Sequence, residues 1–408
     1  MGSLARGASP YDDADMPGRT SATKGSSARN VIGVMTGTSI DGLDAALVSI
    51  EGHGLAMRVA LVERIAAPFP AALASRLRAA AEQTPMTAGD FARLARDFGD
   101  FHADALASLA AGRAVELVAA HGQTVFHAPP VSWQLLNAVP IVAALGCAVV
   151  SDLRQADLIA HGQGAPITPL ADWVMFRAAH DRAVINLGGF CNATVLPGGA
   201  GHERVSGADI CACNQVLDAV ARAALGRPFD ADGAAAASGR ADATAVDSLR
   251  SVLSAQSASR RSLGTGDEAA LWVREFAARL TPNDLAASAA LAVGTTIGDA
   301  LRAAGVRPAG EALLAGGGAR HRALGAAIAE SLGARVHPLD AVGVPVDARE
   351  AAQMAVLGAL AQDGVPISLP AVTGRGESTV RDGAWLFPHG PATNRTHDLR
   401  AAFASRSR

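Results

Sequence analysis

Lysine is almost absent from this sequence: Lys24 is the only one among 408 residues. P-loop NTPases, protein kinases and Schiff-base enzymes all need a buried lysine at the reacting groups, so these classes are excluded. The phosphate-binding pattern G-x-x-x-x-G-K-[ST] is missing as well. Backbone amides, hydroxyls and Mg²⁺ can bind phosphate in this chain without a lysine.

Aromatic residues, cysteines and long apolar runs are also scarce. With one tyrosine and a net charge of −3, the chain shows no base-stacking platform and no sign of nucleic acid or an anionic membrane as partner. The longest apolar run, Ala138 to Val150, is too short to span a membrane and indicates buried core. The four cysteines, in a sequence without a secretory leader, predict reduced thiols and a cytoplasmic location. Cys191, Cys211 and Cys213 fit no structural zinc spacing, so buried thiols are the favoured interpretation.

A chain of 408 residues is long enough for two α/β domains. Its most informative stretch is 31–48. Two short runs, Val31 to Met35 and Ala45 to Ile50, predict the strands of a hairpin. Glycines in its tip let the backbone approach a bulky anion, hydroxyls can donate to phosphate oxygens, and carboxylates can hold a hydrated Mg²⁺. We interpret it as a phosphate-binding hairpin, with an ordinary tight turn as the alternative. The tip consists of Gly37, Thr38, Ser39, Ile40, Asp41, Gly42, Leu43 and Asp44.

A second hairpin of the same kind follows about 150 residues later. The strand Arg182 to Leu187 leads into Gly188 and Gly189, and a further strand covers Ala193 to Pro197. Two such hairpins predict two similar halves that face one another, with a nucleotide held between them.

Several polar or glycine-rich segments lie where predicted strands end, which is where α/β proteins usually bind ligands. His121 and Gln123 follow the strand Val115 to Ala120, and their alternative role is that of satisfied loop residues. Arg154 is the one early cation beside acidic neighbours, and a structural ion pair is its alternative. Three glycines at 316–318 stand at a strand-to-helix junction, where they allow close approach of a flat ring or a phosphate.

Asp209 follows a strand-like segment and precedes a predicted helix over Gln215 to Leu225. We therefore expect its carboxylate to project from a turn. The alternative role is a helix cap, which is common for aspartate.

Together, six segments in order resemble the anhydro-N-acetylmuramic acid kinase family of bacterial cell-wall recycling, within the superfamily of sugar kinases, chaperone ATPases and actin. The resemblance covers about residues 30 to 375. The segments are Gly-Thr-Ser-Ile-Asp-Gly-Leu-Asp (37–44), His-Gly-Gln-Thr (121–124), Gly-Gln-Gly-Ala-Pro (162–166), Asn-Leu-Gly-Gly (186–189), Gly-Gly-Gly-Ala-Arg (316–320) and Asp-Ala-Arg-Glu-Ala (347–351).

The resemblance implies two actin-like (ribonuclease H-like) α/β domains with a nucleotide cleft between them. The first domain would comprise 30–150 and 345–387, and the second 151–344. A disordered tail would cover 1–29, and a polar tail 388–408. The implied reaction hydrolyses the 1,6-anhydro ring of the sugar and phosphorylates O6, with ATP and Mg²⁺ as cofactors.

The resemblance also implies roles for individual residues. Asp209 matches the general base, and Glu350 matches a second carboxylate near the attacking water. Asp41 is the expected Mg²⁺ ligand. ATP would be bound by the hairpin tip 37–44, by Gly188 and Gly189, and by Gly316, Gly317 and Gly318. The sugar would be bound by His121, Gln123, Gln163, Asn186 and Asn214.

The sequence departs from the family pattern mainly on the sugar side. After Asp209 the family commonly has Thr-Gly-Pro-Gly-Asn, whereas this chain has Ile-Cys-Ala-Cys-Asn at 210–214. A kinase of the same fold acting on another sugar therefore stays an alternative. A nucleotide-gated binding protein of the actin and chaperone type is a third possibility, although only a short polar tail follows the last motif, and the retained Asp209 and Glu350 favour an enzyme. The partners expected are the small-molecule anhydrosugar and ATP, and homodimer formation is left open.

Overall fold

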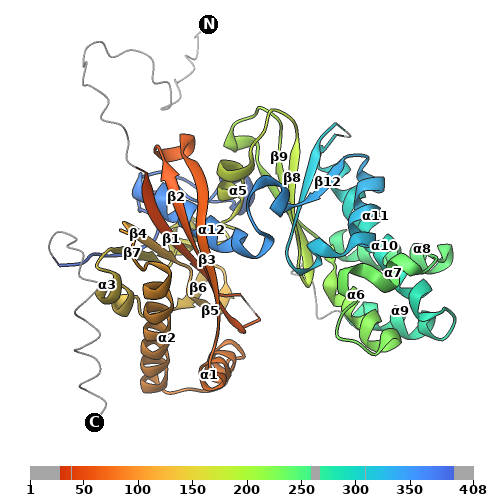
Figure 1. Ribbon diagram of the computed structural model, residues 1–408, viewed down its shortest axis with the longest axis horizontal. Helices are drawn as coiled ribbons and strands as arrows, with labels where there is room; N and C mark the ends of the chain where they lie inside the picture. The colour runs from red at the N-terminus through yellow and green to blue at the C-terminus, as the bar shows by residue number, and fades with distance from the viewer. Residues whose placement is uncertain (1–27, 38, 259–266, 308, 390–408) are drawn as a thin grey trace, which may run out of the picture.

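The computed structural model describes residues 28–37, 39–258, 267–307 and 309–389. The two predicted tails, apart from their innermost residues, and Thr38 lie outside these ranges. Figure 1 shows two sheets side by side, each with its own helices. Among the described helices, none is long and apolar enough to cross a membrane.

The first sheet has the strand order β13-β7-β4-β1-β2-β3. Strands β1, β4 and β7 are parallel, and β1, β2 and β3 form an antiparallel meander. The bounds are β1 (Arg29–Met35), β2 (Gly42–Glu51), β3 (Arg58–Pro68), β4 (Leu117–Ala120), β7 (Ala148–Ser151) and β13 (Ala384–Leu386).

The second sheet, β10-β9-β8-β11-β12, repeats this arrangement. An antiparallel meander of β8, β9 and β10 is followed by β11 and β12, which run parallel to β8. The repeat is the arrangement that the two hairpins predict. The bounds are β8 (Arg182–Leu187), β9 (Phe190–Leu196), β10 (Ser206–Ala212), β11 (Glu311–Ala315) and β12 (Arg335–Pro338). A small separate hairpin pairs β5 (Gln123–Ala128) with β6 (Val131–Leu135).

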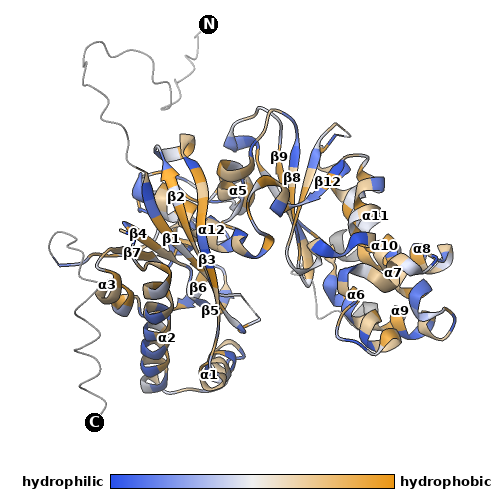
Figure 2. Ribbon diagram, viewed as in Figure 1, coloured by the Kyte–Doolittle hydropathy of each residue, from blue (hydrophilic) through white to orange (hydrophobic). Residues whose placement is uncertain are grey.

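Helices cover the faces of both sheets. On one face of the first sheet, an apolar core forms under α1 (Ala71–Ala81), α2 (Ala88–Leu109) and α3 (Val139–Leu145). Figure 2 shows that α2 presents hydrophilic residues away from this core. The core of the second sheet packs against α6 (Asn214–Val220), α7 (Ala234–Ser238), α8 (Ala243–Ala258), α9 (Asp267–Ala277), α10 (Pro282–Ala303) and α11 (Arg322–Leu332).

Two helices lie between the sheets, α5 (Pro169–Phe176) and α12 (Arg349–Gln362). Their apolar core includes Val31 and Leu117 from the first sheet and Val184 and Leu313 from the second. Because Gly33 of β1 has no side chain, the backbone of α12 can pack directly on this strand. The elements that connect the two sheets therefore form one continuous core. The short helices α4 (Gln155–Ile159) and α13 (Pro370–Thr373) complete the described set.

The N-terminal boundary differs by one residue from the prediction. Arg29 is the first residue of β1 rather than the last of a tail. Its guanidinium binds both carboxylate oxygens of Asp363, at 2.8 and 2.9 Å. This buried pair fixes the start of β1 to the end of α12, while the other predicted domain boundaries stay a prediction.

Candidate active site

A cavity of about 270 Å³ lies where the strand ends of the two sheets meet. It is lined from the first sheet by Asp44 of β2 and from the second by Asn186 of β8 and by the residues that follow β11. The start of α12 closes it. The lining residues are Asp44, Asn186, Ala315, Gly316, Gly317, Arg320, Val346, Asp347, Arg349 and Glu350. The structure thus brings together five predicted site residues that are as many as 306 positions apart in the sequence.

The tip of the first hairpin has its apolar side chains turned inward. Ile40 and Leu43 are buried in the core, so only their backbone can face a ligand. Ser39 Oγ donates to Asp41 Oδ1 at 2.8 Å, and Gln123 Nε2 donates to the carbonyl oxygen of Gly37 at 3.3 Å. These bonds give the tip a defined shape with an acidic edge.

Asp44 stands among other carboxylates at this edge. Desolvation raises the pKa of its carboxyl to about 6, and the negative charges of Asp41, Glu350 and Asp347 add to the shift, with Arg64 opposing it. Arg64 is itself paired with Asp347 at 2.6 Å. A bound cation would reduce the electrostatic repulsion among these carboxylates.

This pKa predicts how cation binding depends on pH. A raised pKa favours the protonated carboxyl, so the contribution of Asp44 to stability is present at low pH and lost as pH rises through about 6. Cation binding needs the ionised form and has the opposite dependence. The advantage of the natural protein over Asp44→Asn in Mg²⁺-ATP affinity should therefore shrink between about pH 7.5 and pH 5. Calorimetric titrations of both proteins across this range measure it, and a ratio that stays constant would contradict the prediction.

The second hairpin is joined to the start of α6. Backbone N–H groups of Cys213 and Gln215 donate to the Gly189 carbonyl oxygen, and that of Asn214 donates to Gly188. Asn214 Nδ2 also donates to the carbonyl oxygen of Leu187 at 2.8 Å. The predicted residues Gly188, Gly189 and Asn214 are therefore one local unit.

The glycines after β11 pack against this unit. A side chain at Gly316, whose φ is +77°, would lie 2.6 Å from Asn186 Oδ1. A side chain at Gly318 would lie 2.8 Å from Asn214 Oδ1. Close approach of the two segments thus requires glycine at both positions.

Gly316→Ala is expected to reduce ATP affinity as well as stability, because the new methyl group must displace Asn186 from the cavity wall. Gly343→Ala is the matched control, since Gly343 has a similar φ of +83° with nothing within 4 Å of the added atom. Gly343→Ala should lose about 1 kcal/mol, because Gly343 is in the left-handed helical region with ψ 9°. Gly316→Ala should lose more, about 1 to 3 kcal/mol from the backbone alone, because ψ 176° at Gly316 is a conformation that only glycine adopts readily. Only Gly316→Ala should lose ATP binding in a fluorescent-nucleotide titration, and equal affinities in the two variants would contradict this.

Glu350 lies in the first turn of α12, and the neighbouring Arg349 anchors that turn. Arg349 Nη2 and Nε donate to the two oxygens of the fully buried Asp172 of α5, at 2.6 and 3.1 Å. Gln353 Nε2 and Thr194 Oγ1 donate to the same carboxylate, at 2.6 and 2.8 Å. Four hydrogen bonds to one carboxylate connect α12, α5 and β9, and so hold the backbone that carries Glu350.

Asp209 is placed differently from the prediction. It lies within strand β10, opposite Asn192 of β9, and not in a turn before a helix. A register shift between Asp209 and Cys211 interrupts the pairing there. Desolvation raises the pKa of its carboxyl. Asp209 does not line the 270 Å³ cavity.

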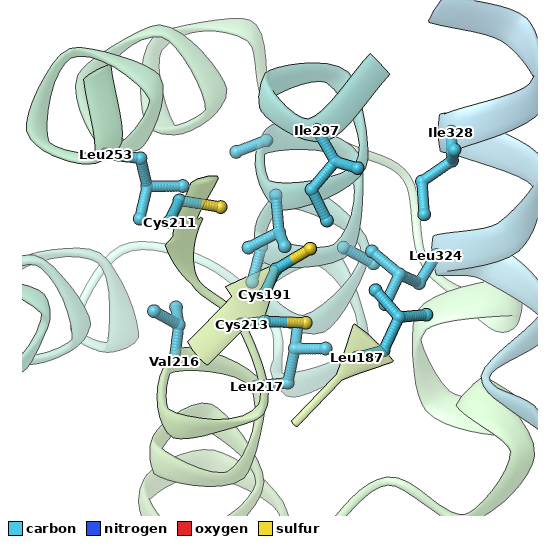
Figure 3. Packing of buried hydrophobic residues seen from close by; sticks show 14 of the residues in the cluster. Leu187, Cys191, Cys211, Cys213, Val216, Leu217, Leu253, Ile297, Leu324 and Ile328 are labelled. Carbon is cyan, nitrogen blue, oxygen red and sulfur yellow. The ribbon is translucent and has the colours of Figure 1, made fainter. Parts of the chain in front are cut away.

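The segment after Asp209 is core, not an exposed loop. Ile210, Cys211 and Cys213 are buried, and Figure 3 shows the two cysteines with Cys191 among leucines, isoleucines and a valine. Burial raises the pKa of all three thiols, to about 12 for Cys211. The expected buried thiols are confirmed. The departure from the family pattern thus exchanges residues that pack inside the second domain.

His121 is buried, and both of its ring nitrogens are engaged. Nδ1 faces the Gly122 carbonyl oxygen at 2.9 Å, and Nε2 accepts from Arg154 Nε at 3.0 Å and Nη2 at 2.9 Å. Burial, with the nearby Arg154 charge, lowers the pKa of His121 to about 3, so the ring is neutral with its hydrogen on Nδ1. In this arrangement His121 orients Arg154. Its assignment to sugar binding stays a prediction.

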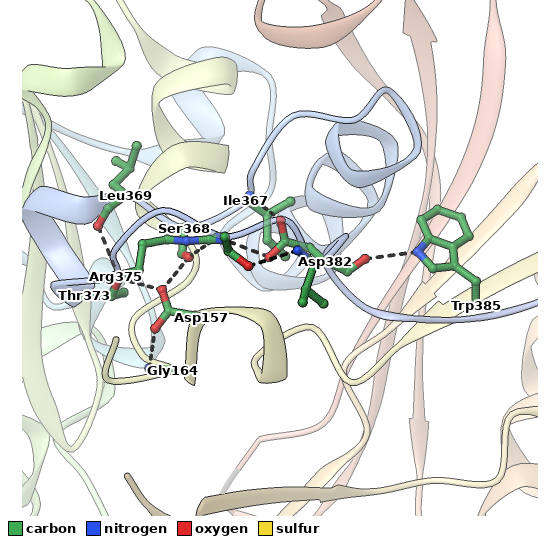
Figure 4. Close-up of polar contacts among 11 residues, drawn as sticks. Asp157, Gly164, Ile367, Ser368, Leu369, Thr373, Arg375, Asp382 and Trp385 are labelled. Atoms are coloured by element: carbon green, nitrogen blue, oxygen red, sulfur yellow. Dashed lines mark hydrogen bonds and ion pairs between the residues drawn. The ribbon is translucent and has the colours of Figure 1, made fainter. Parts of the chain in front are cut away.

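Gln163 lies in a loop that a buried network holds in place. Asp157 accepts from the Gly164 N–H at 2.6 Å, from Ser368 Oγ at 2.5 Å and from Thr373 Oγ1 at 2.6 Å. Figure 4 shows this network extending through Arg375, which donates to Ser368. The loop is thus fixed to the segment after α12.

Three charged cavity residues have no role in the sequence prediction: Arg320, Asp347 and Arg349. Their positions in the sequence could have indicated them, since all three belong to the motifs Gly-Gly-Gly-Ala-Arg and Asp-Ala-Arg-Glu-Ala.

Comparison with known proteins decides the family. The family model described as anhydro-N-acetylmuramic acid kinase matches residues 29–387. The chain belongs to this family. The protein of that name from Salinibacter ruber is 35% identical over 381 residues, covering 86% of this chain and 95% of that protein. The one from Rhodospirillum rubrum is 36% identical over 356 residues, covering 84% and 90%.

Among solved structures, a ROK family glucokinase from Streptomyces griseus in complex with glucose and AMPPNP has a TM-score of 0.39 at 15% identity, covering 81% of this chain and 99% of that one. For this member of the anhydro-N-acetylmuramic acid kinase family, the predicted class, a phosphotransferase with an alcohol acceptor, is confirmed, and the structure confirms an α/β fold with two similar sheets.

Proposed function

We propose that the chain uses ATP and water to convert 1,6-anhydro-N-acetylmuramic acid into N-acetylmuramic acid 6-phosphate and ADP, in the recycling of peptidoglycan. The observation that supports this most is the cavity between the strand ends, where Asp44, Glu350 and the glycines after β11 meet. Phosphoryl transfer needs mainly positioning and charge neutralisation, and this cavity offers backbone amides and carboxylates for both.

ATP would lie between the two hairpins. The tip of the first, from Gly37 to Asp44, offers backbone N–H groups and hydroxyls to the β- and γ-phosphates. The unit of Gly188, Gly189 and Gly316 to Gly318 brings glycine backbone to the cavity wall, where Gly316 and Gly317 line it and a nucleotide can approach the main chain.

Mg²⁺ fits the acidic edge of the cavity. Asp41 and its neighbour Asp44 provide the oxygen ligands that Mg²⁺ prefers, and burial together with the negative charge of Asp41 raises the pKa of Asp44. Among the described residues, no three His, Cys, Asp or Glu side chains surround a single point. One or two carboxylates are enough, because Mg²⁺ usually keeps its waters and phosphate ligands. When bound, the ion neutralises charge on the transferring phosphoryl group.

In the proposed reaction, Asp209 accepts one proton from a water molecule whose oxygen attacks C1 of the sugar. The C1–O6 bond breaks, and O6 attacks the γ-phosphorus as the bond to ADP opens. Glu350, held by the Arg349–Asp172 pair, helps to position the water. A raised pKa suits a general base, since it brings proton affinity closer to the working pH. The proton on Asp209 is then released to solvent.

A coupled assay of ADP release, with Mg²⁺-ATP and 1,6-anhydro-N-acetylmuramic acid, tests this function. ADP release that depends on this sugar is the expected result. Release with a different sugar only, in a panel of hexoses and anhydrosugars, would contradict the assigned substrate. Nucleotide binding without sugar-dependent release in the whole panel would contradict kinase activity toward a sugar.

A further inference from the structure

Arg154 is a cation for which the described residues provide no ion-pair partner. It follows β7, beside the end of β4 where His121 lies. Its Nε and Nη2 donate to His121 Nε2, and its Nη1 donates to the Gly164 carbonyl oxygen at 2.7 Å. All of these acceptors are neutral. Over the described ranges, no carboxylate lies within ion-pair distance of this guanidinium.

The nearest acidic group cannot compensate this charge directly. Asp157 acts on Arg154 at longer range, but its oxygens already accept from Gly164, Ser368 and Thr373. Burial dominates and lowers the pKa of Arg154 to about 10. A partly buried charge without a partner costs free energy, and an anionic ligand would offset that cost.

The surroundings of Arg154 are built to hold it in one orientation. The neutral His121 ring, fixed by its own bond to Gly122, occupies one edge of the guanidinium. Each terminal nitrogen of an arginine carries two N–H groups, so Nη1 and Nη2 each keep one beyond the bonds above. For these two, the part of the chain that is described offers no acceptor. N–H groups on the two adjacent terminal nitrogens can bind the two oxygens of a carboxylate.

Arg154 also stands among the residues assigned to the sugar. Its neighbour His121 is one of these residues. Gln163, another of them, directly precedes Gly164, whose carbonyl oxygen Arg154 binds. Gln123 connects the region to the hairpin tip through its hydrogen bond to Gly37. The Oε1 atom of Gln123 is buried and has no hydrogen-bond partner in the structure as described.

We infer that Arg154 binds the carboxylate of the sugar and thereby selects an acidic sugar over a neutral one. This inference rests on the proposed function, since that function supplies an acid as substrate. The contact would be a charge-assisted, two-pronged hydrogen bond between the terminal nitrogens and the lactyl carboxylate.

Calorimetric titration of the full chain with two sugars tests the inference without needing turnover. The sugars are 1,6-anhydro-N-acetylmuramic acid and its methyl ester, which keeps the shape and lacks the charge. The unaltered protein should bind the acid about 10- to 100-fold more tightly, the range expected for a charged hydrogen bond. If the unaltered protein binds the acid and the ester with equal affinity, the inference is overturned before any variant is made.

Arg154→Gln should bring the two affinities together by weakening the acid and leaving the ester nearly unchanged. Arg154→Lys should keep part of the preference for the acid, because lysine retains the positive charge but lacks the planar pair of N–H donors. Arg96→Gln on the exposed side of α2 is the matched control and should keep the full ratio. An equal loss for both sugars in Arg154→Gln would mean that the residue supports the loop or the phosphates, which overturns the inference.

The outcomes separate this inference from the function on which it rests. Binding of both sugars without a preference contradicts the role of Arg154 and leaves the reaction intact. No binding of either sugar, with nucleotide present or absent, contradicts both.

Discussion

Asp209→Asn is expected to abolish turnover and to leave ATP affinity nearly unchanged. The amide cannot accept a proton from the attacking water, and loss of a general base costs about 10²- to 10⁴-fold in rate. ATP affinity should persist because Asp209 lies in β10, outside the cavity that the hairpin tip and the glycines line. Steady-state kinetics give the fall in kcat, and a nucleotide titration gives the affinity.

The matched control is Asp247→Asn, the same change at an exposed position of α8 in the same domain. It should retain both activity and ATP binding. A large loss of ATP binding in Asp209→Asn, or turnover close to that of the control, would contradict the role of general base.

The second large effect is expected on stability, from Asp172→Ala. The substitution leaves the buried guanidinium of Arg349 without its carboxylate and removes the acceptor of Gln353 and Thr194. Removing one partner of a buried ion pair costs about 3 to 5 kcal/mol. Because Asp172 connects α5 and β9 to the first turn of α12, the variant should also weaken the placement of Glu350. Urea unfolding followed by circular dichroism measures the free energy of unfolding.

Asp97→Ala is the control for this prediction. Its pair with Arg76, at 2.5 Å, is exposed on both sides, so its loss should cost no more than about 1 kcal/mol. The prediction is contradicted if Asp172→Ala loses no more free energy of unfolding than Asp97→Ala does. Such a result would show that the buried pair does not hold the two sheets together.

The part of the fold that the sequence predicts well is the part with local signals. The strands at Val31 to Met35 and Arg182 to Leu187 are short β-branched runs that end in glycine-rich turns, and both are strands of the structure. Such elements are specified by nearby residues, and so could be recognised from the sequence.

The elements that the prediction missed depend on partners far away in the sequence. Strand β13, at Ala384 to Leu386, exists because it pairs with β7, more than 200 positions earlier. Strand β10 reads as the approach to a turn because Gly207 and Asp209 have little β-propensity of their own. It becomes a strand by pairing with β9, while Cys211 is buried in the core that includes α8 and α10. Tertiary packing decided both.

For the site, motifs indicated which residues matter, but not which of them meet. Gly316 and Glu350 line one cavity as their motifs suggest, whereas Asp209 lies outside it. The role of His121 as the partner of Arg154 could not be predicted, because it follows from a contact between two strand ends. Glycine and carboxylate patterns are visible in a sequence, but unpaired charge is visible only in a structure.

The central claim is that one reaction adds both water and phosphate to the sugar, and mass spectrometry of the product formed in ¹⁸O-labelled water tests it most directly. The expected product is heavier than the substrate by one phosphoryl group (HPO₃) and one labelled water, with the ¹⁸O on C1 and the phosphoryl group on O6. A product with phosphate but no labelled oxygen, or a hydrolysed sugar without phosphate, would contradict the coupling of Asp209 chemistry to phosphoryl transfer.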